Sequence, residues 1–224
     1  MREVVDGVFE VGIGYVHVHL VMTDDGVVLV DTGLPGRSGK IGQALHGIRR
    51  KIGDVRTVLL THHHPDHTGG LAEVRRRSGA RVVAHEADVP LITGAERAVY
   101  SHPLLKLSSL IMGTPEPAPV DDVVTTDGYA PLPGFTALHT PGHTAGHLSF
   151  LLDRAGGVLF AGDAAAGKRG GRIGSAPKMV SADLDQQAKS VARLAGLDFE
   201  HAVFGHGSAV SGRAVDRFRE YVAG

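Results

Sequence analysis

Hydrophobic residues in this chain form short runs separated by glycine, proline and charged residues, a pattern that predicts buried β-strands. The expected strands are Tyr15 to Val21, Val27 to Asp31, Thr57 to Leu60, Arg81 to His85 and Leu148 to Leu152. Three more short apolar runs include Ala137-Leu138, Val158 to Phe160 and Ala202 to Phe204. Strands therefore occur in both halves of the chain.

Apolar residues at helical spacing predict amphipathic helices between these strands. The expected helices are a segment through Ile41, Leu45, Ile48 and Ile52, the segment Leu71 to Ser78 that Gly79 ends, and a last helix from about Ala214 to Val222. Asp183, with Gln186 three residues later, is placed to cap a further helix whose apolar face includes Leu184, Val191 and Leu194. Periodicity alone thus predicts a mixed α/β class.

The segment Thr61 to His67 carries the clearest chemical signal. It reads Thr-His-His-His-Pro-Asp-His and directly follows an expected strand. His62 and His64 can reach one metal ion as neutral imidazoles, while Asp66 and His67 point to a second ion. Nitrogen and oxygen ligands of this kind suit zinc, iron or manganese.

Three other apolar runs also end in a glycine turn followed by a residue that can bind metal. These residues are His143, Asp163 and His206. Sheet-based enzymes place their sites just beyond the carboxyl ends of strands, where glycine lets the backbone approach closely. We therefore expect four strand ends to converge on one metal cluster.

With these motifs the chain resembles the metallo-β-lactamase superfamily, whose signature is HxHxDH followed by a His in a TPGHT-like turn, an Asp in GD and a final His. The stretch Val30 to Gly33 is similar to the family's early strand that ends in a DTG turn. The resemblance implies a four-layered αββα sandwich and a dinuclear metal centre. It implies that His62, His64 and His143 hold the first ion, that Asp66, His67 and His206 hold the second, and that Asp163 bridges both.

Length and composition are consistent with one compact domain spanning residues 1–224. The chain has 224 residues, of which 42% are hydrophobic, so it can bury a sizeable core. An apolar helical insertion is expected at about 94–120, ended by a proline-rich turn. Its residues Leu107, Leu110 and Met112 are candidates for an apolar wall of the substrate pocket, with core packing and a homodimer contact as competing uses.

Net charge and cysteine content limit which molecules and metal ligands the sequence predicts. A net charge of −1 offers no general attraction to phosphate backbones, so we expect a small-molecule substrate and no nucleic acid. With no cysteine, any metal has to be held by His and Asp. The first residues lack the pattern of a signal peptide and no apolar run approaches a membrane span, so a cytoplasmic protein with no membrane partner is expected.

Several polar residues outside the ligand set are further candidates. Asp31 follows a strand and could orient a ligand imidazole, although capping its own turn is an equally simple role. Tyr15 and His17 could contact substrate, and Lys168 could bind a substrate carboxylate or phosphate. His63 alternates with its neighbours and is expected to face away from the metal ions.

The expected chemistry is hydrolysis. Two divalent ions about 3.5–4 Å apart can share a water, lower its pKa toward about 7 and present hydroxide to a carbonyl or phosphoryl group. Zinc is the expected ion, with iron or manganese as alternatives, and Asp66 is the candidate catalytic residue that orients the nucleophile or carries a proton. We expect a hydrolase for a small ester, thioester or lactone.

Three alternatives from other classes stay open at this point. They are a mononuclear-iron persulfide dioxygenase, a phosphodiesterase and a non-catalytic metal-binding module. The β-lactamases of the family lack a bridging Asp, so Asp163 argues against antibiotic hydrolysis as the main reaction.

Overall fold

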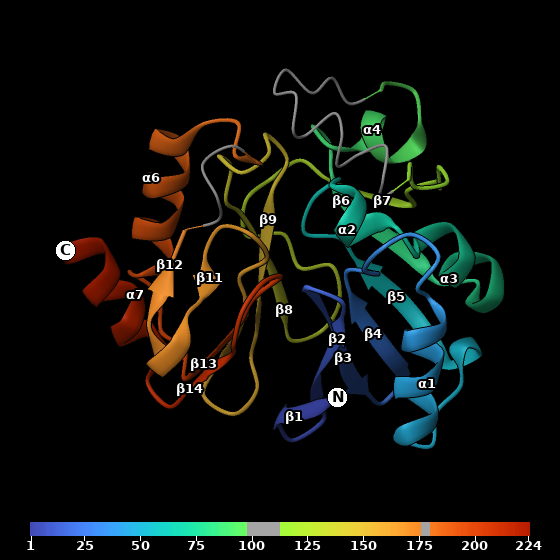
Figure 1. The fold of residues 1–224 in the computed structure, drawn as a ribbon, viewed down its shortest axis with the longest axis horizontal. Helices are drawn as coiled ribbons and strands as arrows, with labels where there is room; N and C mark the ends of the chain where they lie inside the picture. The colour runs from blue at the N-terminus through green and yellow to red at the C-terminus, as the bar shows by residue number, and fades with distance from the viewer. Residues whose placement is uncertain (98–112, 176–179) are drawn as a thin grey trace. The chain divides into compact units, whose positions relative to one another are not determined.

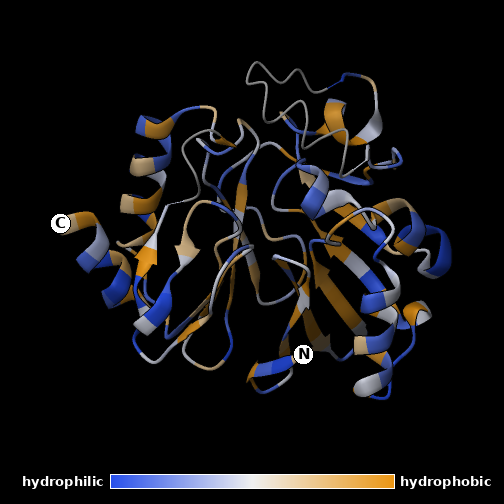
Figure 2. Cartoon of the chain, in the orientation of Figure 1, coloured by the Kyte–Doolittle hydropathy of each residue, from blue (hydrophilic) through white to orange (hydrophobic). Residues whose placement is uncertain are grey.

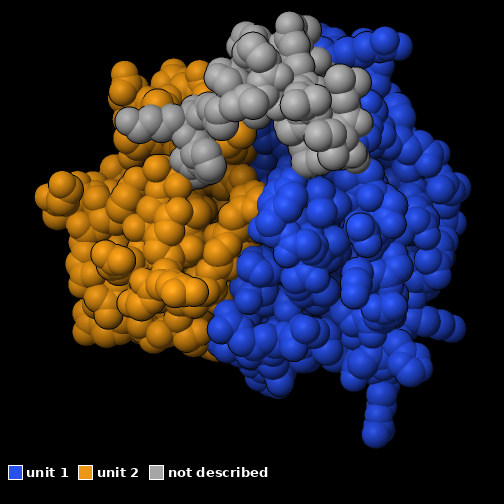
Figure 3. Space-filling model, in the orientation of Figure 1, with its two compact units in different colours: residues 1–123 blue, residues 124–224 orange. Residues whose placement is uncertain are grey.

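The computed structural model describes residues 1–97, 113–175 and 180–224 (Figure 1). By its internal contacts the chain divides into two compact units, unit 1 at Met1–Val123 and unit 2 at Val124–Gly224 (Figure 3). Whether they act as the single domain expected from the sequence stays a prediction. Most of the expected insertion, including Leu107, Leu110 and Met112, lies outside the described residues.

Unit 1 is built on a seven-stranded sheet with its strands in sequence order. The strands are β1 (Arg2–Val5), β2 (Val8–Ile13), β3 (Val16–Thr23), β4 (Gly26–Val30), β5 (Val55–Leu59), β6 (Arg81–His85) and β7 (Asp122–Val124), the last of which runs across the boundary between the units. Strands β1 to β4 pair antiparallel, whereas β4, β5 and β6 pair in parallel. The carboxyl ends of β4 and β5 therefore lie at the same edge of the sheet, which brings Asp31 beside the loop that starts at Thr61.

The helices of unit 1 are α1 (Gly39–Gly47), the short 3-10 helix η1 (Ile52–Asp54), α2 (Pro65–Thr68), α3 (Leu71–Ser78) and α4 (Val89–Thr93). Helix α3 has the predicted bounds, and Gly79 ends it with a φ of 70°. The helix expected through Ile52 is shorter than predicted. It ends at Gly47 because Arg49 adopts a left-handed backbone with a φ of 57° and the Arg50 amide donates to the Leu45 carbonyl.

The core of unit 1 forms where helices pack on the sheet. Leu20, Leu29 and Val58 from the strands are buried with Leu45 of α1 and Val74 of α3. Figure 2 shows this distribution, with hydrophobic residues concentrated along β4 and β5 and hydrophilic residues on the outer turns of the helices. Helices α1 and α3 thus bury their apolar faces against the sheet and keep their polar faces outward.

Unit 2 is built on a five-stranded sheet in the order β14-β13-β10-β9-β8, with a separate ribbon of β11 and β12. The strands are β8 (Phe135–His139), β9 (Leu148–Leu152), β10 (Val158–Phe160), β11 (Ala166–Gly167), β12 (Ile173–Gly174), β13 (His201–Val203) and β14 (Val210–Ser211). Strand β9 is antiparallel to β8 and β10, and β10 is parallel to β13. Strands β8, β10 and β13 consequently end at one edge of this sheet, and the loops with His143, Asp163 and His206 start there.

Helices α6 (Leu184–Leu194) and α7 (Ala214–Ala223) lie side by side in unit 2 (Figure 1), where a 3-10 turn, η2 (Arg169–Gly171), follows β11. The predicted N-cap of α6 is confirmed, since the Asp183 side chain accepts a hydrogen bond of 2.9 Å from the Gln186 amide. Phe199, Phe204 and Phe218 are fully buried in the core between these elements. Among the described residues, no helix is long and apolar enough to cross a membrane.

Buried His19 in β3 generates a prediction about acid stability. Burial, followed by the nearby charge of His17, lowers the pKa of His19 from 6.5 to about 3. Below pH 6.5 the unfolded chain takes up a proton that the folded chain does not, so the free energy of unfolding falls as the pH falls toward 3. Between about pH 7.5 and about pH 5, the titration of His19 alone lowers the free energy of unfolding by about 2 kcal/mol.

We expect His19→Gln to show a smaller loss of stability than the wild type over that range, by about 2 kcal/mol. Urea unfolding of both proteins at the two pH values measures the difference. An identical loss in the two proteins would contradict the assignment.

Candidate metal centre

The loop after β5 gathers three imidazoles within unit 1. His62 Nε2 lies 3.1 Å from His64 Nδ1, and the ring centroids of His62 and His67 are 4.1 Å apart. Pro65 occupies the first turn of α2, which places Asp66 and His67 in consecutive helical positions with their ligand atoms within 4.8 Å of each other. His62 and His67 are buried, whereas His64 and Asp66 are partly exposed.

Asp31 orients this loop through three hydrogen bonds. Its Oδ1 accepts from the Thr61 amide at 2.8 Å, and its Oδ2 accepts from the Thr61 hydroxyl at 2.7 Å. The same Oδ2 lies 2.8 Å from His67 Nδ1. Because a carboxylate accepts, Nδ1 of His67 carries the proton and Nε2 keeps the lone pair that a metal ion needs.

The same carboxylate also selects the tautomer of His62. The Thr61 hydroxyl donates to Asp31, so the lone pairs of its oxygen remain to accept from His62 Nδ1, which is 3.0 Å away. His62 therefore also presents Nε2 as the unprotonated nitrogen. One buried carboxylate thus sets the tautomers of two candidate ligands.

The turn after Asp31 is packed tightly against α2. The Thr32 amide and hydroxyl both donate to the His67 carbonyl, at 2.7 and 2.9 Å. A Cβ atom at Gly69 would lie 2.2 Å from the Pro35 nitrogen, and one at Gly70 would lie 2.6 Å from the Thr32 carbonyl oxygen. Glycine is required at both positions for this close approach, which fixes the backbone of His67.

In unit 2 one carboxylate oxygen lies close to two imidazoles. Asp163 Oδ2 is 3.4 Å from His143 Nε2 and 3.2 Å from His206 Nε2. His143 Nδ1 lies 3.2 Å from the Ser181 hydroxyl, which can accept from Nδ1–H when Nε2 binds a metal ion. His143 and Asp163 are buried, and His206 is partly exposed.

The loop with His206 also depends on glycine. The Gly167 amide donates to the His206 carbonyl at 3.1 Å. A Cβ atom at Gly207, whose φ is 89°, would lie 1.9 Å from the Gly167 carbonyl oxygen. Any side chain at position 207 would therefore displace the backbone beside His206.

Donor spacing within each unit fits metal coordination. Two ligands at 2.0–2.1 Å from a tetrahedral zinc ion are about 3.3 Å apart. The three donor pairs described above, one in unit 1 and two in unit 2, are separated by 3.1, 3.4 and 3.2 Å. The donor chemistry also fits, because imidazole nitrogen and carboxylate oxygen are the ligands that zinc accepts in the absence of cysteine.

The ring of His63 lies 4.9 Å from the ring of His64, centroid to centroid, and its own polar contact is with Asp88. His63 Nδ1 lies 3.1 Å from Asp88 Oδ2, and the His63 amide donates to the same oxygen at 3.0 Å. Tyr15 is 55% exposed, His17 is partly buried in β3, and Lys168 is exposed. Leu107, Leu110 and Met112 lie outside the described residues.

Sequence reasoning overlooked two hydroxyl groups that contact candidate ligands. Thr61 lies beside Nδ1 of His62, and Ser181 lies beside Nδ1 of His143. Thr61 directly precedes the HxHxDH motif, so its position was a usable signal. Ser181 lies 38 positions beyond His143, and no local pattern connects them.

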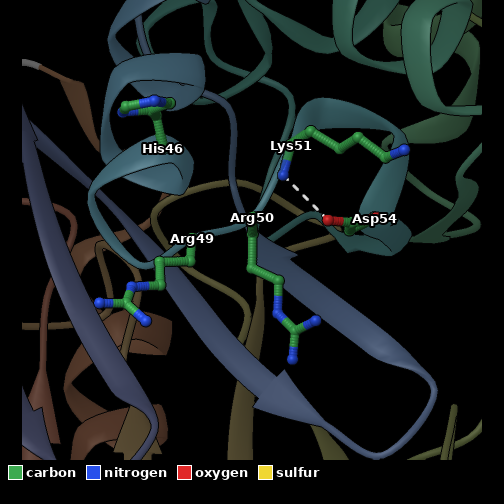
Figure 4. Close-up of a pocket in the computed structure, with 5 residues that line it drawn as sticks. All are labelled: His46, Arg49, Arg50, Lys51 and Asp54. Atoms are coloured by element: carbon green, nitrogen blue, oxygen red, sulfur yellow. Dashed lines mark hydrogen bonds between the residues drawn. The ribbon is translucent and has the colours of Figure 1, made fainter.

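A basic surface depression lies beside the end of α1, lined by His46, Arg49, Arg50, Lys51 and Asp54 (Figure 4). Asp54 is engaged by the Lys51 amide at 2.9 Å. In Figure 4 the four basic side chains point in different directions, so they do not form a converging set of donors. We assign no binding site there.

Comparison with known proteins identifies the family. A family model described as the metallo-beta-lactamase superfamily matches residues 11–206. The chain therefore belongs to this superfamily of metallo-hydrolases, as the motifs predicted.

Among curated proteins, the probable metallo-hydrolase YflN of Bacillus subtilis is 29% identical, over 83% of this chain and 77% of that protein. A hydroxyacylglutathione hydrolase of Shewanella pealeana is 32% identical, over 72% of this chain and 48% of that protein. The matched region thus spans about half the length of the hydroxyacylglutathione hydrolases.

Solved structures agree on the fold. The metallo-beta-lactamase family protein TTHA1429 of Thermus thermophilus matches with a TM-score of 0.71 and 29% identity, covering 99% of this chain and 80% of that one. The Rm3 metallo-beta-lactamase matches with a TM-score of 0.67 and 30% identity, covering 89% and 75%. The predicted fold class is confirmed as a mixed α/β fold with two sheets that matches metallo-β-lactamase structures.

The bonds of Asp31 generate a prediction about metal binding. We expect Asp31→Asn to weaken zinc binding by about 10- to 100-fold, because an amide cannot accept from all three donors and the tautomers of His62 and His67 are released. His63→Ala is the matched control from the same loop and should change the affinity by less than a few-fold. Chelator competition measures both dissociation constants. Wild-type affinity in Asp31→Asn would show that Asp31 only caps its own turn.

Proposed function

We propose that this chain is a dinuclear metal-dependent hydrolase that cleaves a small ester, thioester or lactone. The observation that carries the proposal is the position of Asp163 Oδ2, within 3.4 Å of His143 Nε2 and 3.2 Å of His206 Nε2. A carboxylate oxygen this close to two imidazole nitrogens is placed to be shared by two ions, one for each imidazole. A closed structural site would need only one set of ligands.

The proposed ligands are those that the family signature implies. His62, His64 and His143 would hold one ion, Asp66, His67 and His206 would hold the other, and Asp163 would bridge them. Support comes from each unit by itself, since the donor pairs within unit 1 and within unit 2 are spaced for coordination. Zinc is the proposed ion, with iron or manganese as alternatives.

When bound, two such ions supply an activated water and a Lewis acid that polarises the substrate oxygen. The protein's part is to keep the imidazoles in the correct tautomer and to bring the carboxylates to them. Asp31 does the first for His62 and His67 through the bonds already described. Asp66 lies next to His67 in the partly exposed first turn of α2, where it can orient the nucleophile or carry a proton to the leaving group.

The choice of an acyl substrate is supported by relatives named hydroxyacylglutathione hydrolase. A panel of chromogenic esters, thioesters, lactones and phosphodiesters, assayed at defined metal content, tests it directly. We expect turnover of at least one acyl substrate and none of the phosphodiesters. Oxygen uptake on a persulfide with no hydrolysis of any panel member would support the iron dioxygenase instead.

Replacing the shared carboxylate should separate chemistry from folding. We expect Asp163→Ala to lower kcat/KM on the best acyl substrate by at least about 100-fold, equivalent to about 2.7 kcal/mol of transition-state stabilisation. His63→Ala should stay within a few-fold of wild type, since His63 contacts Asp88. Equal losses in both variants, at equal thermal stability, would contradict the assignment of Asp163.

A further inference from the structure

A chain of fully buried polar side chains lies behind Asp163 in unit 2. Its members are Thr140 after β8, His147 before β9 and Ser149 within β9, all with 0% exposure. The Asp163 amide donates to His147 Nε2 at 2.9 Å. His147 Nδ1 lies 2.9 Å from the Thr140 hydroxyl, which is 2.9 Å from the Ser149 hydroxyl.

The direction of every bond in this chain follows from its two ends. A backbone amide can only donate, so His147 Nε2 accepts and carries no proton. The proton of the neutral ring is then on Nδ1, which donates to Thr140 Oγ1. Thr140 in turn donates to Ser149, and Ser149 donates to the Ala161 carbonyl at 3.2 Å. Each group in this hydrogen-bonded series therefore donates one proton. The series begins at the Asp163 amide and ends at the Ala161 carbonyl, two residues apart in the sequence.

A second side chain holds the other side of the Asp163 peptide. Gln187 of α6 is 3% exposed, and its Nε2 donates to the carbonyls of Asp163 at 3.0 Å and Ala164 at 3.1 Å. The backbone of Gln187 packs closely against the loop of His143. A Cβ atom at Gly142 would lie only 2.3 Å from the Gln187 amide nitrogen. The backbone of Asp163 is thus fixed at its N–H by His147 and at its C=O by Gln187.

We propose that His147 is a positioning residue for Asp163. Its neutral Nδ1–H tautomer holds the amide of Asp163 and so aims the carboxylate at His143 and His206. Gly162, with a φ of 54°, turns the chain just before Asp163, and the bond to His147 fixes the amide that follows this turn. The inference rests on the proposed function, because it concerns the carboxylate assigned there as the shared ligand.

Two substitutions of similar size separate positioning from simple packing. The side-chain oxygen of Gln reaches the place of the imidazole Nε2, so His147→Gln keeps an acceptor for the Asp163 amide. Asn is shorter, so His147→Asn keeps a donor toward Thr140 but leaves the amide of Asp163 without its acceptor. Ser149→Ala breaks the far end of the chain and leaves the bond to Asp163 in place.

The readouts are the zinc dissociation constant, measured by chelator competition with the metal alone, and the thermal stability of each metal-free variant. We expect His147→Asn to bind zinc about 10- to 100-fold more weakly than wild type. His147→Gln and Ser149→Ala should stay within a few-fold of wild type. His147→Gln and His147→Asn both lose the ring, so a purely structural role predicts equal effects on binding from these two.

Equal weakening by Asn and Gln, or wild-type binding by both, would overturn the positioning role while leaving the proposed function standing. A wild-type protein that binds none of zinc, iron and manganese would overturn both. The 15N chemical shifts of the His147 ring in the wild-type protein give a test that needs no variant. A protonated Nδ1 supports the proposal, and a protonated Nε2 contradicts it, since that nitrogen could not accept from Asp163.

Discussion

The loop from Thr61 to His67 in unit 1 depends on the hydrogen bonds that the buried carboxylate of Asp31 accepts. Asp31 adopts a left-handed backbone with a φ of 62°, a conformation that costs a non-glycine residue about 1–2 kcal/mol. Its bonds to Thr61 and His67 hold it there despite that cost. The strained turn directs one carboxylate toward donors on two later segments, and the tautomers of two imidazoles follow from it.

In unit 2, neutral groups rather than a carboxylate hold a candidate ligand in place. There the carboxylate of Asp163 is the proposed ligand, and buried imidazole, hydroxyl and amide groups hold its backbone. Both units place candidate ligands or their partners just past the carboxyl ends of parallel strands, β4 and β5 in one and β10 and β13 in the other. Parallel pairing sets these candidate ligands at one edge of each sheet, and buried hydrogen bonds then orient His62 and His67 and fix the backbone of Asp163.

Sequence reasoning succeeded where the signal is local. Strands β6 and β9 and helix α3 have the predicted bounds, because apolar runs and Gly79 define them. Helix α1 ended early because the left-handed turn at Arg49 leaves no mark in hydrophobic spacing. The contacts of Asp31 with His67 and of His143 with Ser181 span 36 and 38 positions, so they depend on strand order and loop packing that periodicity does not encode.

The central claim is that this chain needs two metal ions to hydrolyse its substrate. Titrating metal-free protein with zinc, while following bound metal and hydrolysis of an acyl substrate together, tests it most directly. A dinuclear hydrolase should reach saturation at two ions per chain, with activity that rises as the second ion binds. Full activity at one ion per chain, or two bound ions with no hydrolysis of any ester, thioester or lactone, would contradict it.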